Sequence, residues 1–224
     1  MKPSLLAAIS LAIVLSGSLG LSRVSAQSDK LGETPPDQQA AITALRGITS
    51  NLQKNRDGTV RFIRFSKKHV EDKHLDQIAV FQQLDYLAVI TPTVTDVGLA
   101  NIQGLANLES LILTNCQATD KTAALLGGLT KLKTLELAGT QISNDAIEVI
   151  SRLKKLTHLS LANTAIDDRG LESLARLPFL QSINLSKTRV TDAVFEKLSG
   201  IASLKSIYLD DTSVTGKNIG TLSQ

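Results

Sequence analysis

Hydrophobic residues recur along this chain with a period of 24 residues. From Phe81 to the end of the 224-residue sequence, six successive units carry apolar side chains at the same six positions, and residues 57–80 continue the frame more weakly. The fourth position is Leu in all six units: Leu84, Leu108, Leu132, Leu156, Leu180 and Leu204. Several columns that stay in phase over six units indicate a repeat array.

Within each unit, the spacing of the apolar positions changes from that of a strand to that of a helix. In the unit 153–176, the seventh and ninth positions are Leu159 and Leu161, two residues apart, as on one face of a strand. The nineteenth and twenty-second positions, Leu171 and Leu174, are three residues apart, which is a helical step. Each unit is therefore predicted to fold as a short strand, a polar turn and a short helix, and to bury its apolar side by stacking on its neighbours.

The unit LKKLTHLSLANTAIDDRGLESLAR, residues 153–176, resembles the leucine-rich-repeat family, and the resemblance covers 57–224. Thr at position 12 and Asp at position 16 are similar to the cysteine-containing subclass, which also occurs in F-box substrate receptors, and to exported proteins of planctomycete-type bacteria. The chain lacks an F-box-like segment and the usual Asn at position 12. The resemblance implies an α/β leucine-rich-repeat solenoid, a right-handed β-α superhelix with parallel strands on the concave face and short helices on the convex face.

The N-terminus has the pattern of a secretory signal peptide over residues 1–26. Lys2 gives a positive start, an apolar run follows over residues 5–15, and small residues precede Gln27. The run is shorter than the roughly 20 apolar residues that a membrane span needs. We expect export to the periplasm, cell surface or medium and no integral membrane span after cleavage; an uncleaved anchor is the alternative.

Between the signal and the array, we expect a flexible linker over residues 27–39 and an N-terminal helical cap over residues 40–56. Thr34 is predicted to be the N-cap of the cap helix, with Pro35 in its first turn. The repeat array then fills residues 57–224 with about seven units. In the last unit, Gly216 and Gly220 interrupt the helical half, so this end is either a modest cap or an edge that a partner covers.

Composition and charge narrow the range of functions. The net charge is +3, and loss of the signal peptide with Lys2 and Arg23 lowers it to +1, so the sequence gives no reason to expect nucleic-acid binding. Glycine-rich phosphate loops and metal-binding Cys/His spacings are absent, so no cofactor or metal is expected. Cys116 is the single cysteine, which excludes an internal disulfide. The basic stretch around residues 61–74 contains Glu and Asp and is interpreted as a solvated face.

Side chains at positions 6, 8 and 10 of each unit are predicted to point away from the core, because positions 7 and 9 point inward. This outward surface is small and mostly neutral, and it is apolar near its start, which favours binding of a protein ligand. The alternative is that β-branched and aromatic residues simply favour strands. The candidate binding residues are Phe62, Tyr86, Ala88, Ile90, Ile112, Glu136, His158 and Tyr208.

No catalytic residues are predicted. His158 has Ser160 and Glu136 on neighbouring positions, but a catalytic triad needs Ser and His within about 3 Å and a group that orients the His. Adjacent strands about 4.8 Å apart are expected to offer neither a pocket nor oxyanion donors. Cys116 has no His near it in the repeat frame, so a nucleophilic role is not expected.

Two polar columns are given structural roles. The Asp residues at position 16 each precede a helical stretch and are interpreted as helix N-caps, a role that the hydroxyl residues at position 15 could share. The small residues at position 12 are expected to bond the turn backbone of adjacent units. The Asp column comprises Asp96, Asp120, Asp168 and Asp192.

The sequence therefore predicts an exported, non-catalytic binding module that recognises a protein through the concave strand face. Three alternatives remain open. The chain could be a structural or self-associating protein of the cell envelope, a substrate-recognition subunit similar to F-box receptors, or an enzyme subunit. The oligomeric state and the identity of the ligand are not determined by the sequence.

Overall fold

The computed structural model of the chain describes residues 34–67 and 69–222. The predicted signal peptide, residues 1–26, lies outside the described residues, as do residues 27–33 of the predicted linker. Among the residues that are described, no helix is long and apolar enough to cross a membrane.

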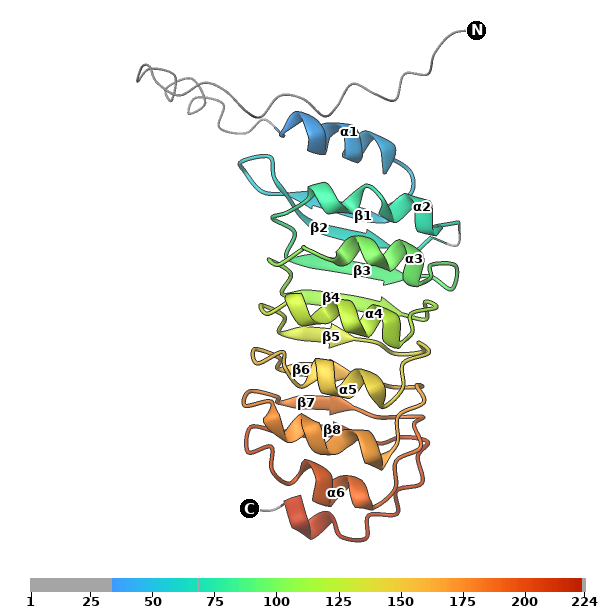
Figure 1. The fold of residues 1–224 in the computed structure, drawn as a ribbon, viewed down its shortest axis with the longest axis vertical. Helices are drawn as coiled ribbons and strands as arrows, with labels where there is room; N and C mark the ends of the chain where they lie inside the picture. Colours follow the sequence, from blue (N-terminus) through green and yellow to red (C-terminus); the bar gives the residue numbers. More distant parts are fainter. Residues whose placement is uncertain (1–33, 68, 223–224) are drawn as a thin grey trace, which may run out of the picture. The chain divides into compact units, whose positions relative to one another are not determined.

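The described residues form one sheet of eight strands in which every strand lies beside its neighbour in sequence (Figure 1). Strands β2 to β8 are parallel, and each pairs with the next at an offset of one 24-residue unit, as in Leu111↔Leu135 and Leu135↔Leu159. Ile63 pairs with Leu87, so the strand of residues 57–80 continues the register of the later units. The strands are β1(Asn51–Lys54), β2(Val60–Phe65), β3(Tyr86–Ile90), β4(Ser110–Thr114), β5(Thr134–Glu136), β6(His158–Ser160), β7(Ser182–Asn184) and β8(Ser206–Tyr208).

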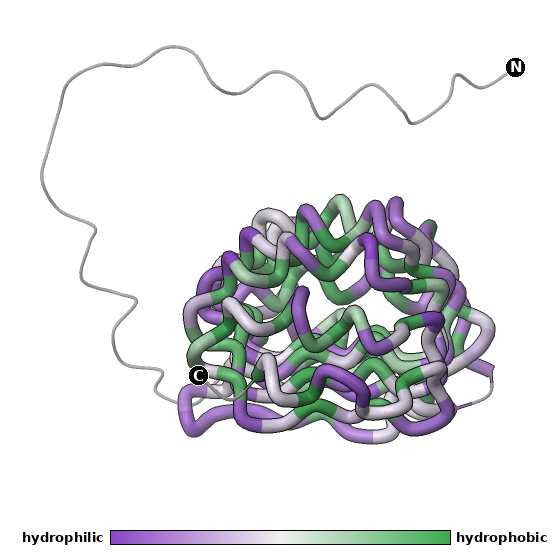
Figure 2. The backbone as a smooth tube through the Cα atoms, turned by 90° about the horizontal axis from the view of Figure 1, so that it is seen from below, coloured by the Kyte–Doolittle hydropathy of each residue, from purple (hydrophilic) through white to green (hydrophobic). Residues whose placement is uncertain are grey.

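Each strand from β2 to β7 is followed by a crossover that contains a short α-helix, a 3-10 helix or both, as the change of spacing predicts. Viewed along the stack, both the strand row and the helix row carry hydrophobic residues, and many hydrophilic residues lie in the outer turns (Figure 2). The helices are α1(Pro36–Ala44), α2(Asp72–Leu75), η1(Ile78–Val80), α3(Asp96–Leu99), η2(Ala100–Ile102), α4(Asp120–Leu125), η3(Leu126–Gly128), α5(Asp145–Ile150), η4(Asp168–Arg176), α6(Ala193–Leu198) and η5(Ile219–Leu222).

The apolar columns form one continuous core along the stack. Leu132, Leu156 and Leu180 are each 0 % exposed, and they occupy the same place in three successive units. Burial of a Leu side chain contributes roughly 2 kcal/mol, and an isolated unit would leave this surface in water. The array is therefore held together by contacts between neighbouring units.

The turn after each of five strands requires a left-handed backbone at position 11. This conformation is unfavourable for most L-residues and is tolerated best by Gly, Asn and Asp. The column follows this preference except at one Lys. Its members are Asn115 (φ 57), Gly139 (φ 69), Asn163 (φ 53), Lys187 (φ 59) and Asp211 (φ 55).

The N-terminal cap differs from the sequence prediction in two ways. Helix α1 begins at Pro36, so the residues assigned to a linker up to 39 and the cap boundary at 40 are wrong at this point. Thr34 is not the N-cap: Pro35 holds that position, and the Thr34 hydroxyl instead donates to the carbonyl of Gly58 at 3.1 Å. Proline at the first turn needs no N–H partner, which allows the helix to start here.

The cap also contains a strand that the hydrophobic pattern did not predict. Strand β1 pairs antiparallel with β2, with Leu52 opposite Ile63. Residues 55–58, whose sequence NRDG is typical of a turn, are the loop of this hairpin. Together α1 and β1 cover the first repeat, and the side chain of Gln38 accepts a 3.4 Å hydrogen bond from the amide of Val60.

The position-16 carboxylates bridge neighbouring units, so their assignment as N-caps of their own helices is wrong. Asp96 accepts from the amide of Thr119 at 2.9 Å and from its hydroxyl at 2.7 Å. The Thr119 hydroxyl in turn caps α4 by accepting from the amide of Lys121 at 3.2 Å. The same bridge joins Asp72 to Thr95, Asp120 to Ser143, Asp168 to Thr191 and Asp192 to Thr215.

One bridge carries a paired replacement. Asp167 stands at position 15 in place of a hydroxyl residue, and Asn144 stands at position 16 of the preceding unit in place of Asp. The Asn144 amide donates to the Asp167 carboxylate at 2.8 Å and its oxygen accepts from the Asp167 backbone N–H at 3.2 Å. An Asp at 144 would place two carboxylates face to face, which the amide avoids.

The position-12 residues Cys116, Thr140, Thr164 and Thr188 are buried, and they bond within their own unit and not to the adjacent one, contrary to the prediction. Thr140 and Thr164 each donate to the carbonyl three residues earlier at 2.6 Å, and the Cys116 thiol lies 3.5 Å from the carbonyl of Leu113. These bonds close the turn after each strand, where a backbone carbonyl would otherwise be unsatisfied.

Candidate functional site

The outward side chains of β2 to β8 at positions 6, 8 and 10 form an uncovered surface, which we call the strand face. The parallel register aligns each position in a row that crosses the strands, as in Tyr86↔Ser110 and Ile112↔Glu136. No described helix lies on this side of the sheet, since the crossovers all pack on the other side (Figure 1).

An aromatic pair lies at the start of the strand face. The rings of Phe62 and Tyr86 are stacked with centroids 4.1 Å apart and planes inclined by 8°. Burial raises the pKa of the Tyr86 hydroxyl; the Arg64 guanidinium acts against this rise and the Glu136 carboxylate adds to it. The hydroxyl is therefore a neutral hydrogen-bond donor at neutral pH.

The other apolar candidates near this pair lie on two adjacent strands, β3 and β4, and one of them is not accessible. Ile90 and Ile112 are half-buried on adjacent strands. Ala88 is 0 % exposed, so its place among the binding residues is wrong. Its methyl group lies in register between the longer side chains of Arg64 and Ile112. We call Phe62, Tyr86, Ile90 and Ile112 the apolar patch.

The middle of the strand face is hollowed, contrary to the expectation that adjacent strands offer no pocket. An open hollow of about 370 Å³ is bounded by polar and small side chains from four successive strands and the turns that follow them. Glu136 and His158 lie on its wall. The remaining lining residues are Thr114, Ala138, Leu159, Ser160, Ala162, Ser182 and Asn184.

The hollow does not assemble a triad. The His158 ring nitrogen Nδ1 lies 2.9 Å from the hydroxyl of Thr157, its chain neighbour. Among the described residues, no hydrogen bond or ion pair joins His158 to Ser160 or Glu136. The geometry that nucleophilic catalysis requires is therefore not formed here.

Tyr208 is 51 % exposed on β8, the last strand, so the structure does not bring it together with the apolar patch. Of the eight candidate residues, Phe62 and Tyr86 are in contact, Ile90 and Ile112 lie on β3 and β4, and Glu136 continues the row of Ile112 on β5.

Cys116 is 2 % exposed, and burial raises the pKa of its thiol to about 11. A thiol in this environment is protonated at neutral pH and inert as a nucleophile. Within residues 34–67 and 69–222, no cluster of three or more His, Cys, Asp or Glu side chains is arranged to hold a metal ion.

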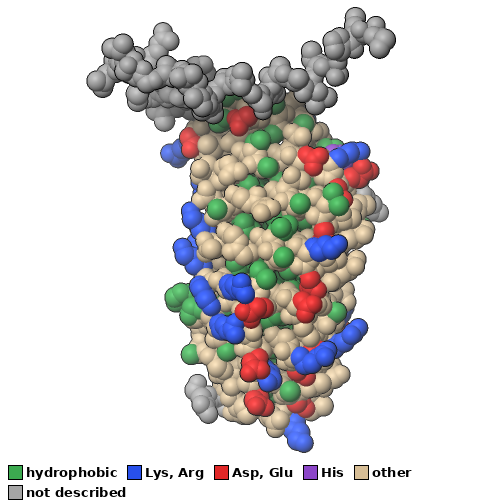
Figure 3. All heavy atoms as spheres, viewed as in Figure 1, with side chains coloured by type: hydrophobic (Ala, Val, Ile, Leu, Met, Phe, Trp, Pro, Cys, Tyr) green, Lys and Arg blue, Asp and Glu red, His purple; other side chains and the backbone are tan. Residues whose placement is uncertain are grey.

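Charged side chains are mixed in sign on the side of the molecule drawn in Figure 3, where Lys and Arg alternate with Asp and Glu. In the basic stretch, Arg61 binds Asp85 at 2.8 Å and Lys73 binds Glu71 at 2.7 Å. These pairs support the interpretation of the stretch as a solvated face.

Comparison with known proteins agrees with this geometry. A family model described as Leucine Rich repeat matches residues 128–151 and 152–175. Each match begins one residue before the corresponding 24-residue unit defined above. No curated protein matches the sequence.

Two solved structures from Listeria monocytogenes str. 4b F2365 are similar in fold. Internalin C2 is 21 % identical with a TM-score of 0.60 over 87 % of this chain and 90 % of that chain. The internalin inlF is 20 % identical with a TM-score of 0.51 over 73 % of this chain, which spans 58 % of that structure.

A parallel strand row backed by short helices at a 24-residue period defines a leucine-rich-repeat solenoid. Residues 128–175 match the family model, and the fold class is the one that the sequence predicts.

Proposed function

We propose that this protein is an exported, non-catalytic module that binds a protein ligand through the strand face. The stacked pair of Phe62 and Tyr86 beside Ile112 carries the proposal. Aromatic side chains that lie half-exposed on a rigid sheet are typical anchors of protein interfaces. Export rests on the signal-peptide pattern of residues 1–26.

The chemistry of the strand face supports a ligand with an apolar anchor and a positive charge. The apolar patch lies on β2 to β4, and Glu136 follows Ile112 in the same row on β5. Neighbouring strands are about 4.8 Å apart. A ligand that places an apolar side chain on the patch would therefore have its neighbouring group close to the Glu136 carboxylate. The hollow beyond it would accept polar groups.

The experiment is a capture of partners from the culture medium and cell-surface fraction with the immobilised protein, followed by mass spectrometry. We expect Ile112→Glu to reduce recovery of the specific partner at least about tenfold, because it places a charge in the centre of the apolar patch. Tyr86→Ala removes half of the stacked pair and should weaken binding to a similar degree.

The matched control is Val97→Glu. Val97 is an apolar side chain on α3 that is 74 % exposed and lies away from the strand face. It should retain the partner. Equal recovery with Ile112→Glu and with the unmodified protein would rule out the apolar patch as the binding site.

A further inference from the structure

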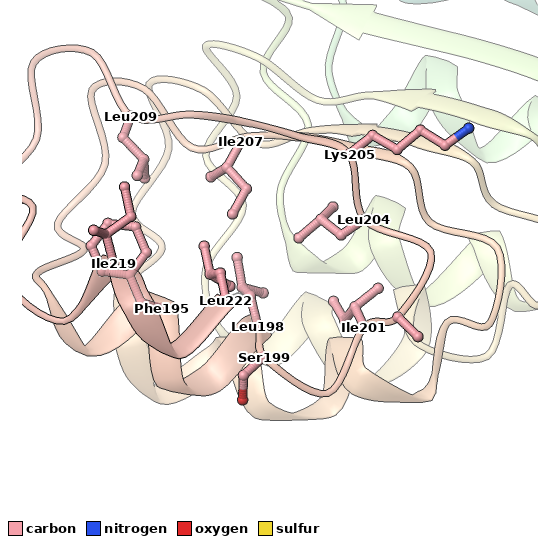
Figure 4. A pocket seen from close by; sticks show the side chains of 11 residues that line it. Phe195, Leu198, Ser199, Ile201, Leu204, Lys205, Ile207, Leu209, Ile219 and Leu222 are labelled. Carbon is pink, nitrogen blue, oxygen red and sulfur yellow. The ribbon is translucent and has the colours of Figure 1, made fainter. Parts of the chain in front are cut away.

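The last repeat leaves its core open at the end of the stack. In the preceding units, residues at positions 4, 7 and 9 are almost fully buried, whereas Leu204, Ile207 and Leu209 are only half-buried. These side chains line a hollow of about 390 Å³, in which Leu209 points toward Ile219 and Ile207 points toward Leu222 (Figure 4). Ile219 is 60 % exposed at its rim. No described residue covers this surface.

The backbone of β8 is open on the same side. In the preceding unit, the amide of Leu185 donates to Tyr208 at 2.9 Å and the amide of Lys187 donates to Asp210 at 2.8 Å. The equivalent amides of Leu209 and Asp211 have no acceptor among the described residues. The end of the array therefore offers both unpaired strand hydrogen bonds and accessible core.

We propose that this end binds a second copy of the chain, with the two β8 strands paired antiparallel about a two-fold axis near Tyr208. In this register, Ile207 of one copy lies opposite Leu209 of the second copy. Ser206 lies opposite Asp210 of the second copy, and Lys205 lies beside Asp211 of the second copy in the turn that follows its strand. The two hollows then face each other, and each copy closes the core of the other.

The register is set by the sequence of the edge. Opposite residues in an antiparallel pair share one face of the sheet, so a self-paired strand shifts in steps of one residue about its centre. Centring the pair on Ile207 would place Lys205 against Leu209 and Asp210 against Leu204, with both charges unpaired on apolar side chains. Centring it on Tyr208 pairs apolar with apolar and Lys with Asp, which is the self-complementary arrangement.

The test is the mass of the purified protein, expressed from its full-length sequence, measured by sedimentation over a range of concentrations. We expect a monomer–dimer equilibrium. Asp211→Lys should weaken the dimer about tenfold or more, because each two-fold contact then opposes two lysines. The double variant Lys205→Glu with Asp211→Lys should restore it, because the charges are exchanged. Both changes have precedents in the array, since Glu109 occupies position 5 and Lys187 occupies position 11 with φ 59.

Ile219→Lys should abolish the dimer without unfolding the chain, because Ile219 is already exposed at the rim. The matched control, Phe179→Lys, changes a 58 % exposed side chain away from the hollow and should leave the dimer intact. A monomer at every concentration would overturn the proposal and indicate a different occupant. A dimer that Ile219→Lys leaves unchanged, or that the charge exchange fails to restore, would overturn it as well.

Discussion

Replacing Leu156 with Ala lowers the free energy of unfolding by about 3 kcal/mol. Leu156 is 0 % exposed and lies between the equivalent leucines of the units before and after it, Leu132 and Leu180. Truncation would remove apolar contacts with both neighbouring units and leave a cavity that the regular backbone cannot close. Urea denaturation followed by circular dichroism measures the loss.

The control for Leu156 is the same substitution in the same column at the end of the stack. Leu204 is only half-buried, because no described unit follows it. Leu204→Ala should therefore cost about half as much as Leu156→Ala. If the protein dimerises through this end, the comparison must be made at concentrations where it is a monomer. Equal losses at the two positions would contradict a core that is shared between neighbouring units.

The second large effect is expected from Asp96→Ala, which lowers the free energy of unfolding by about 2 kcal/mol at pH 7. The substitution removes the acceptor of the Thr119 amide and hydroxyl and of the hydroxyl of Thr122, which is 0 % exposed. Asp145→Ala is the control. Its carboxylate is exposed at the start of α5 and accepts no side-chain bridge, so its loss should change stability by less than about 0.5 kcal/mol.

The Asp96 effect should also depend on pH. Burial acts to raise the pKa of the Asp96 carboxyl, but the hydrogen bonds from Thr119 and Thr122 outweigh it and hold the pKa below its ordinary value of 3.8. A depressed pKa in the folded state means that the carboxylate stabilises the protein above the unfolded pKa. This contribution is lost as the pH falls through the folded pKa. The difference between Asp96→Ala and the unmodified protein should therefore shrink between about pH 5 and pH 2. A difference that stays constant over this range would exclude the bridge as its source.

The fold could be predicted because the core repeats. Leu132, Leu156 and Leu180 recur at the same position of successive units, and stacking of the units buries all of them in one core. The observed strand register follows the same 24-residue spacing. The cap could not be predicted in the same way, since β1 has one neighbour and a single short stretch, NLQK, with no repeated column to mark it. A signal was present in residues 55–58, where a turn directly before a strand is compatible with a hairpin.

The polar columns show a second limit of reasoning from spacing. An Asp just before a helix is consistent with capping that helix, and also with bonding to the turn of the next unit. The choice depends on the distance between units, which the sequence does not give. The sequence analysis therefore assigned Asp96 to the helix of its own unit, although it bonds to Thr119 of the next unit. One signal was present: Asn144 departs from the Asp column at position 16, and its partner Asp167 departs from the hydroxyl column at position 15. Ala88 was misplaced for a similar reason, because its exposure depends on the length of its neighbours Arg64 and Ile112.

The position of the strand face could be predicted, but its shape could not. The alternation of inward and outward residues places Tyr86 and Ile112 on the strand face, on the adjacent strands β3 and β4. The stacking of Phe62 on Tyr86 and the hollow beside His158 depend on side-chain conformations that no spacing specifies. The open end was visible in the sequence only as a choice between a cap and a covered edge.

The measurement that tests the account most directly is the deletion of one whole repeat. Without residues 105–128, the units before and after the gap meet in register, with Leu87 opposite Leu135. The Asp96 carboxylate would then lie next to Ser143, whose amide and hydroxyl already donate to the equivalent carboxylate of Asp120. The shortened chain should fold, unfold cooperatively and lose stability in proportion to the missing unit.

Deletion of residues 105–116 alone removes half a repeat, joins the end of one helix to the middle of a turn, and should leave the chain largely unfolded by circular dichroism. If both deletions unfold the chain to the same extent, the units are not interchangeable layers on a shared core, and the account is contradicted.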